Sequence, residues 1–322
     1  MKRFLYLGVA VLVVVIGWTL AWYWAAGEVR KGADMLAEAD GIANPRLTCN
    51  TLDVAGFPFR FDVTCAGATI VSGDLTVSLA GLKATVLVYR PTHALASAKG
   101  PLTLTDAFSG GSSRVDWTGM ELSARLEGWR LGRVSLVADT LSWNDTLLGD
   151  MLIARADHFE AHLVDIPERH QAEEGVAALA FYAKSDRVEA PGLAIEDGDL
   201  SFEAELSALP DDVRNFADPV AIERWRQLGG TLDIFALKGT DGDTSIDGSG
   251  TLALNNAAQL EGEVTIASKG VVETLEPLLA PGMGPLVFGS PAADGTYSQT
   301  LKITGGVVYS GMLAVGAVPP LL

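Results

Sequence analysis

Three histidines close together in the sequence are the first candidates for chemistry. His158 and His162 stand four residues apart in LIARADHFEAHLVDI, and His170 follows shortly after. The stretch alternates apolar and polar residues as a β-strand does, which puts His158, Glu160 and His162 on one face. Two imidazoles and a carboxylate in this arrangement could bind zinc. The same pattern is typical of the solvated face of a strand, and we favour that interpretation.

Acidic residues offer two further possibilities. Asp241, Asp243 and Asp247 in GTDGDTSIDGSG are similar to part of a calcium loop, but the later bidentate glutamate is missing, so a polar turn is favoured. A carboxylate pair for glycoside hydrolysis could be drawn from the 40 acidic residues, yet no pair is designated by its position. The sequence has no G-x-S-x-G elbow, phosphate-binding loop or dinucleotide fingerprint. We therefore expect no catalytic residue, no metal and no cofactor.

The two cysteines, Cys49 and Cys65, flank the sequence GFPFRF. They are symmetric about Phe57, so a hairpin that turns through residues 55–58 would place the two sulfur atoms directly opposite each other. We predict a disulfide, because we expect the body of the protein in an oxidising compartment. Closing a loop of this size stabilises the fold by about 3 kcal/mol in the chain-entropy model. A metal site made from two cysteines alone is a poorer alternative.

The residues between the cysteines combine a turn with an aromatic strand. After the turn, Phe57, Phe59 and Phe61 fall on one face because side chains alternate along a strand. This face needs an apolar cover, which is either the protein's own core or, as the functional alternative, a ligand in an open groove. The candidate groove residues are Gly56, Phe57, Pro58, Phe59, Arg60 and Phe61.

An uncharged apolar segment runs from Phe4 to Ala26, directly after Lys2 and Arg3. As a helix it is long enough to cross a hydrocarbon core of roughly 30 Å. The basic residues favour a cytoplasmic N-terminus, and aromatic residues gather at the other end of the segment. We predict a single-pass inner-membrane protein, held in the lipid bilayer through residues 4–26, with its body in the periplasm. The alternative is a cleaved signal peptide, whose apolar region is usually shorter.

The rest of the chain is predicted to follow this anchor in two parts. Residues 1–27 form the anchor with a short cytoplasmic N-terminus, residues 28–45 a helical stalk, and residues 46–322 a periplasmic β-rich domain with a possible sub-boundary near 210. Helical insertions are expected within 211–228 and 271–280, where the alternating pattern is interrupted.

The body has the pattern of a long antiparallel sheet. In GDLSFEAELSAL and similar segments, a glycine-containing turn opens an alternating run, and Leu200, Phe202 and Ala204 face one way. About fifteen to eighteen such runs lie between Arg46 and Leu313. A meander of this length must curl, close or split to hide its apolar face. We therefore expect a mainly β fold, a long curved sheet shaped as a groove or open barrel, with a few short helices.

The formal net charge of −17 limits the partners of this body. An acidic surface repels phosphate backbones, so we expect no nucleic-acid partner.

Two segments resemble a known family. V-x-GFPFRF followed by a cysteine, behind a tryptophan-rich N-terminal helix, resembles a family of Gram-negative envelope proteins catalogued as domain of unknown function number twenty-one twenty-five. YRPTHALASAKGPLTL, from Tyr89 to Leu104, resembles the same family. The family has no established reaction, so the resemblance implies architecture and location and no catalytic residues. More distantly, the layout is similar to AsmA-like envelope proteins, which are thought to form elongated β grooves that carry lipid.

These observations lead to one favoured function and two alternatives. We expect a membrane-anchored β-groove protein that binds or transfers lipid, or another amphipathic envelope component, by burying its apolar part. The second hypothesis is a non-catalytic envelope scaffold whose sheet edges or acidic face bind protein partners, which the sequence does not identify. The third is a periplasmic hydrolase with a polar cleft.

Overall fold

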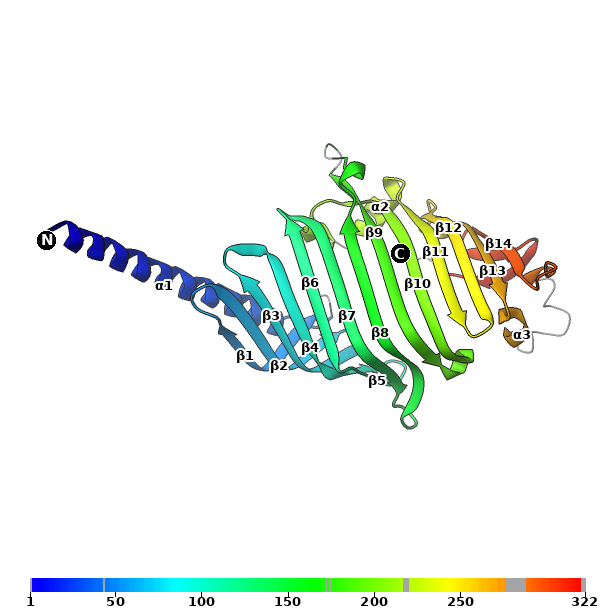
Figure 1. The fold of residues 1–322 in the computed structure, drawn as a ribbon, viewed down its shortest axis with the longest axis horizontal. Helices are drawn as coiled ribbons and strands as arrows, with labels where there is room; N and C mark the ends of the chain where they lie inside the picture. The colour runs from blue at the N-terminus through cyan, green and yellow to red at the C-terminus, as the bar shows by residue number, and fades with distance from the viewer. Residues whose placement is uncertain are drawn as a thin grey trace. The chain divides into compact units, whose positions relative to one another are not determined.

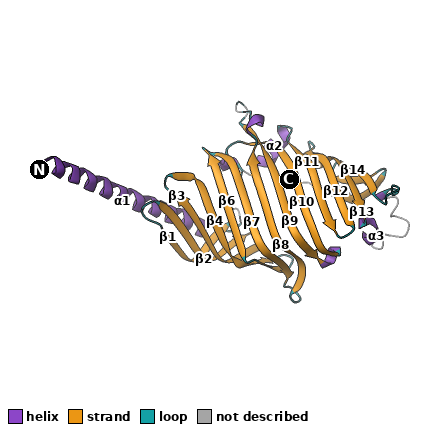
Figure 2. Cartoon of the chain, in the orientation of Figure 1, coloured by secondary structure: helices purple, strands orange, loops and turns teal. Residues whose placement is uncertain are grey.

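The computed structural model of the chain describes residues 2–42, 44–171, 173, 175–216, 220–275 and 288–319. Two compact units are present: unit 1 comprises Met1–Ser123 and Ser142–Met151, and unit 2 comprises Ala124–Leu141 and Leu152–Leu322. A boundary near residue 210 stays a prediction. Strands dominate the described structure (Figure 2), which confirms the mainly β fold class.

The described chain starts with one long helix and continues as strands joined by turns and a few short helices (Figure 1). The helices are α1 (Lys2–Ala37), η1 (Pro167–Arg169), η2 (Pro191–Leu193), η3 (Val213–Asn215), α2 (Ala221–Gln227) and α3 (Val271–Leu275). The strands of the first half are β1 (Arg46–Ala55), β2 (Arg60–Ser72), β3 (Leu75–Leu87), β4 (Arg90–Asp106), β5 (Ser112–Asp116), β6 (Gly119–Glu127), β7 (Arg130–Asp145) and β8 (Met151–Asp165). Those of the second half are β9 (Val176–Ala190), β10 (Ile195–Pro210), β11 (Thr231–Asp241), β12 (Thr244–Leu254), β13 (Leu260–Lys269), β14 (Tyr297–Thr304), β15 (Val307–Ser310) and β16 (Leu313–Ala317).

The strands form one antiparallel sheet of 16 strands, within the number that the sequence predicts. Apart from β6, which pairs with β4 and β7, each strand lies beside its neighbour in the sequence or the next one along. This order follows from short connections between alternating segments. The turn from β2 to β3 is an example, since Ser72 pairs with Leu75 and Gly73 between them has a φ of 59°.

Two predicted helical insertions are present in shorter form. Helix α2 lies within the predicted range 211–228, and its first turn carries Glu223 while its last carries Arg224 and Arg226, which suits the helix dipole. Helix α3 covers the start of the predicted range 271–280, and the rest of that range lies outside the described residues.

Helix α1 is a part of unit 1 and continues well beyond its apolar segment. It is the one helix among the described residues that is long and apolar enough to cross a membrane. Trp22 and Ala26 on this helix are buried together with Val54 of β1. Partly buried apolar residues of β2 and of the β3–β4 turn complete the cluster. Arg30 donates a hydrogen bond from Nη2 to the Val54 carbonyl oxygen at 3.1 Å. The region predicted as a stalk therefore begins as helix packed on the sheet.

The predicted disulfide between Cys49 and Cys65 is present. The predicted register was wrong, however, because Cys49 pairs with Ala68 and Cys65 pairs with Leu52 in the β1–β2 ladder. The turn is centred later than symmetry about Phe57 suggests: β1 ends at Ala55, and residues 57–59 form the turn. The bond thus joins the strands diagonally.

Two glycines of β12 offer a test of how closely the strands of unit 2 pack. A Cβ on Gly250 would lie 2.2 Å from the Glu263 carbonyl oxygen, whereas a Cβ on Gly248 would have its nearest neighbour, Leu237 Cβ, at 3.5 Å. Backbone cannot give way as a side chain does. We therefore expect Gly250→Ala to lower the free energy of unfolding by about 1–3 kcal/mol or more. Gly248→Ala should leave the free energy of unfolding nearly unchanged. A urea titration of each variant measures this free energy, and an equal decrease in both variants would contradict this packing.

Candidate functional site

The GFPFRF turn packs against helix α1. The Trp22 ring stacks on Phe61, with centroids 5.2 Å apart and an interplanar angle of 7°, and meets Phe57 edge to face at 5.6 Å. Tyr23 also stacks on Phe57 at 6.0 Å. Part of the aromatic surface predicted from the sequence is therefore covered by the N-terminal helix.

Hydrogen bonds to the turn backbone hold this contact in register. Trp18 Nε1 donates to the Pro58 carbonyl oxygen at 3.0 Å, and Trp22 Nε1 donates to the Arg60 carbonyl oxygen at 3.1 Å. Gly56 is required at its position because its φ is 102° and a Cβ there would lie 2.8 Å from the Arg60 carbonyl oxygen. The turn is thus built to fit two indole rings.

An apolar pocket of about 620 Å³ lies beside this contact, and we call it the hairpin pocket. One wall is helix α1 at Val14, Val15, Trp18 and Thr19, and the other is formed by the turns of two hairpins, at Phe57, Pro58, Phe59, Val88 and Tyr89. Phe59 and Tyr89 are 64% and 69% exposed, so these large rings remain available for contact.

The basic residues near these turns differ in their surroundings. Arg60 forms an ion pair with the buried Asp62 at 2.8 Å, and Asp62 also accepts a hydrogen bond from Thr85 Oγ1 at 2.7 Å. Arg90 is exposed at the start of β4, next to Tyr89. Lys99 is exposed further along β4, opposite Gly81. Arg60 and Arg90 therefore directly follow pocket-lining residues in the sequence and stand at the bases of the two turns.

Unit 2 carries an apolar face that crosses its strands. Side chains of cross-strand partners share a face of a sheet. From β8 to β14, one row of successive partners is Leu163, Phe181, Ala204, Ile234, Gly250, Val264 and Leu301. The adjacent row is Ala161, Ala183, Phe202, Leu237, Gly248, Ile266 and Gln299. We call these rows, with the flanking rows through Leu200 and Leu206, the apolar face.

Most of the large side chains of the apolar face are incompletely covered, although Leu179 and Ile303 in the row through Leu206 are buried. Those that are half-buried instead of buried include Leu163, Phe181, Phe202, Leu206, Leu232, Ile234, Leu237, Ile246, Leu252, Val264, Ile266 and Leu301. The opposite face is polar, as its row Glu160, Lys184, Ser201, Lys238, Asp247, Ala267 and Ser298 shows. One face of unit 2 is thus suited to water and the other to an apolar contact.

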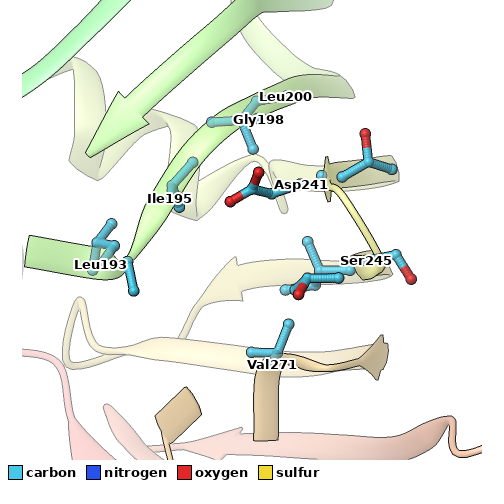
Figure 3. Close-up of a pocket in the computed structure, with 12 residues that line it drawn as sticks. Leu193, Ile195, Gly198, Leu200, Asp241, Ser245 and Val271 are labelled. Carbon is cyan, nitrogen blue, oxygen red and sulfur yellow. The ribbon is translucent and has the colours of Figure 1, made fainter. Parts of the chain in front are cut away.

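The apolar face ends in a pocket of about 290 Å³ at the β11–β12 turn (Figure 3). Leu200 of β10, together with Gly239 and Ile246, forms the last row of the face and also lines this pocket. Leu193 and Val271 line it from η2 and α3. Polar groups of the turn, at Thr240, Asp241, Thr244 and Ser245, also contribute to the lining. The pocket therefore combines an apolar floor with polar groups at one end of the strands.

The histidines considered from the sequence each contact a carboxylate, but they do not converge. His158 Nδ1 lies 2.7 Å from Asp139 Oδ1, His162 Nε2 lies 3.2 Å from Glu160 Oε2, and His170 Nε2 lies 2.7 Å from Asp165 Oδ1. Asp241 instead accepts backbone hydrogen bonds from residues 196 and 197. Among the residues the structure describes, no three metal-binding side chains form a group that could hold an ion.

The clearest pKa shift belongs to a surface ion pair away from both pockets. Hydrogen bonds from Arg226 and Gln227 lower the pKa of Glu223 to about 2. These contacts lie within helix α2, so they stabilise a local element.

Sequence reasoning identified the turn of the hairpin pocket but missed its partners. The contact of Trp18 and Trp22 with GFPFRF joins segments forty residues apart, and only the spacing of the tryptophans, four residues on a helix, could have suggested a shared face. The pocket at the β11–β12 turn gives no motif. The only sequence features that could have indicated this pocket are the strand alternation and the glycines at its edge.

Comparison with known proteins assigns the chain to a family and to no established activity. A family model described as "Uncharacterized protein conserved in bacteria (DUF2125)" matches residues 22–319. No curated protein matches the chain, and neither does any solved structure. The similarity to AsmA-like proteins stays a prediction. The match includes the GFPFRF turn and all the strands, and the chain belongs to the DUF2125 family of bacterial proteins.

Proposed function

We propose that this protein is anchored in the inner membrane by α1 and binds or transfers lipid, or another amphipathic envelope component, on the apolar face of unit 2. The observation that carries the proposal is the apolar face itself, which crosses seven strands, is incompletely covered and leads into a pocket. An acyl chain gains roughly 0.8 kcal/mol for each methylene group removed from water, so binding needs no catalytic group.

The dimensions of the apolar face suit an acyl chain. From Leu200 to Leu206 along β10 the face extends roughly 20 Å, at about 3.3 Å per residue. One leaflet of a bilayer core is about 15 Å thick, half of roughly 30 Å. A chain that spans one leaflet can therefore lie along β10 to β12, with its polar end near the hydroxyl and carboxylate groups at the β11–β12 turn.

Two features support a retained anchor and a periplasmic body. Removing the apolar segment as a signal peptide would take Trp22 from its contacts with Phe57 and Phe61 and expose Val54. The Cys49–Cys65 disulfide is of the kind that forms and persists in oxidising compartments. Both are expected of a single-pass protein whose body lies outside the cytoplasm.

Crosslinking from a lipid probe tests the proposed function. The full chain would be incubated with phosphatidylethanolamine that carries a diazirine in one acyl chain, and then irradiated. Mass spectrometry would identify the crosslinked residues. We expect crosslinks in β10–β13. Ile266→Asp, which puts a charge on the apolar face, should reduce them about tenfold or more, a change of at least about 1.4 kcal/mol.

Thr265→Asp is the matched control, because Thr265 is adjacent in β13 and exposed on the opposite face, where it contacts Thr300. It adds the same charge and should leave crosslinking unchanged. Crosslinks confined to helix α1 would refute binding on unit 2, and so would equal crosslinking in both variants.

A further inference from the structure

The position of unit 1 relative to the membrane follows from the length of helix α1, provided that α1 spans the bilayer as proposed above. From Arg3 to Trp22 the helix rises about 28 Å, at 1.5 Å per residue. This matches a hydrocarbon core of roughly 30 Å. Trp22 donates its hydrogen bond to the Arg60 backbone, so the charged Arg60–Asp62 pair lies near the level where the core ends. Arg3 and Arg60 thus bracket the apolar layer.

The two hairpin turns lie on the membrane side of that level. Pro58 accepts its hydrogen bond from Trp18, one helical turn or about 6 Å closer to the bilayer centre than Trp22. The hairpin pocket extends to Val14, about 12 Å from the level of Trp22. The β3–β4 turn lies at the same level along α1 as the β1–β2 turn, since Val88 N donates to the Phe59 carbonyl oxygen at 2.9 Å.

Three backbone carbonyl groups of the first turn are hydrogen-bonded within the protein. In a bilayer core, polar backbone groups must be paired within the protein. The Gly56, Pro58 and Phe59 carbonyl oxygens accept bonds from Arg60 N, Trp18 Nε1 and Val88 N, respectively. Pro58 has no N–H to satisfy. These three carbonyl groups therefore have their partners within the protein and do not depend on water for them.

The exposed side chains at this place are aromatic. Phe59 and Tyr89 project from the two turns with 64% and 69% of their surface exposed, and the hairpin pocket between these turns and α1 is lined almost entirely by apolar atoms. Arg60 and the exposed Arg90 stand at the bases of the turns, where lipid phosphates would lie. Large exposed rings cost little in lipid and much in water.

We propose that the β1–β2 and β3–β4 turns are inserted into the outer leaflet of the membrane, and that the hairpin pocket holds an acyl chain of a phospholipid from that leaflet. Unit 1 is then a membrane-inserted module whose depth is set by the Trp18 and Trp22 hydrogen bonds. The site is separate from the apolar face, because all its residues belong to unit 1.

Fluorescent labels at single added cysteines test the depth of the turns. Phe59→Cys, Tyr89→Cys, Val11→Cys and Phe108→Cys would be labelled with an environment-sensitive dye, with the Cys49–Cys65 disulfide left intact. The full chain would be reconstituted into vesicles of phosphatidylethanolamine and phosphatidylglycerol. The label at position 11 reports whether helix α1 spans the bilayer. Phe108 is the matched control, because it is 89% exposed in unit 1 and follows the opposite end of β4.

Nitroxide groups on the lipid acyl chains should quench the labels at 59 and 89 at least about fivefold more than the label at 108, because quenching requires contact within the leaflet. Iodide in water should give the reverse order. If the label at 11 is quenched while those at 59 and 89 behave like 108, leaflet insertion is wrong although the anchor stands. If the label at 11 also stays accessible to iodide, the proposed anchor itself fails.

Discussion

Trp22→Ala is expected to release the β1–β2 hairpin from helix α1. Trp22 is 5% exposed, contacts Phe57 and Phe61 and donates a hydrogen bond to Arg60. Truncating a buried tryptophan to alanine typically costs about 3–5 kcal/mol, since it removes apolar contacts and leaves a cavity. Amide hydrogen exchange in β1 and β2, measured on the full chain in detergent, should accelerate roughly 150- to 5,000-fold, at about 1.36 kcal/mol for each factor of ten.

Trp24→Ala provides the control for this measurement. Trp24 lies two residues further along the same helix and is 70% exposed, so its removal alters the composition of the helix equally but breaks no buried cluster. Exchange in β1 and β2 should then stay near the wild-type rate. If the two alanine variants exchange at the same rate, helix α1 does not hold the hairpin and does not fix the depth of unit 1 in the membrane.

Loss of the Cys49–Cys65 disulfide is the second change with a large expected effect. The bond closes a loop of sequence separation 16. In the chain-entropy model this restricts the unfolded chain enough to stabilise the fold by about 3 kcal/mol. For the Cys49→Ala/Cys65→Ala double variant, the urea midpoint of β1–β2, followed by pulse proteolysis, should fall by roughly 1–3 M if the urea m-value is about 1–3 kcal/mol/M.

Reductant separates the disulfide from other effects of the substitutions. Dithiothreitol should lower the midpoint of the wild-type chain to that of the double variant and leave the double variant unchanged. An unchanged wild-type midpoint after complete reduction would show that the hairpin is held by its contact with α1 alone. Cys65 is 5% exposed, so reduction has to be verified by alkylation under denaturing conditions.

Strand periodicity made the fold class predictable. Leu200, Phe202 and Ala204 alternate with polar residues, and in the structure all three lie in successive rows of the apolar face. The alternation of side chains along a strand is a local property, so it does not depend on which strand lies beside it. The long uncharged segment and the disulfide were predictable for the same reason, since hydrophobic length and cysteine spacing need no partner beyond the segment itself.

The register of the first hairpin was not predictable from symmetry. The turn over residues 57–59 places Leu52 opposite Cys65, where sequence symmetry had placed Cys49. Turn geometry sets which residues pair, and a turn displaced by one or two residues moves every pair. A disulfide tolerates this displacement because it depends on the distance between two residues and not on direct cross-strand pairing.

The sequence by itself determined a sheet with one apolar face, one helix able to span a membrane and a stapled hairpin, because each of these depends on residues near one another in the chain. Only the tertiary structure decided what covers the aromatic residues of GFPFRF: Trp18 and Trp22, about forty residues earlier, do so in part and leave Phe59 exposed. It also decided that the apolar face stays half-buried and ends in a pocket. The physical reason is that periodicity states which side chains avoid water, whereas the surface that shields them is set by contacts distant in sequence.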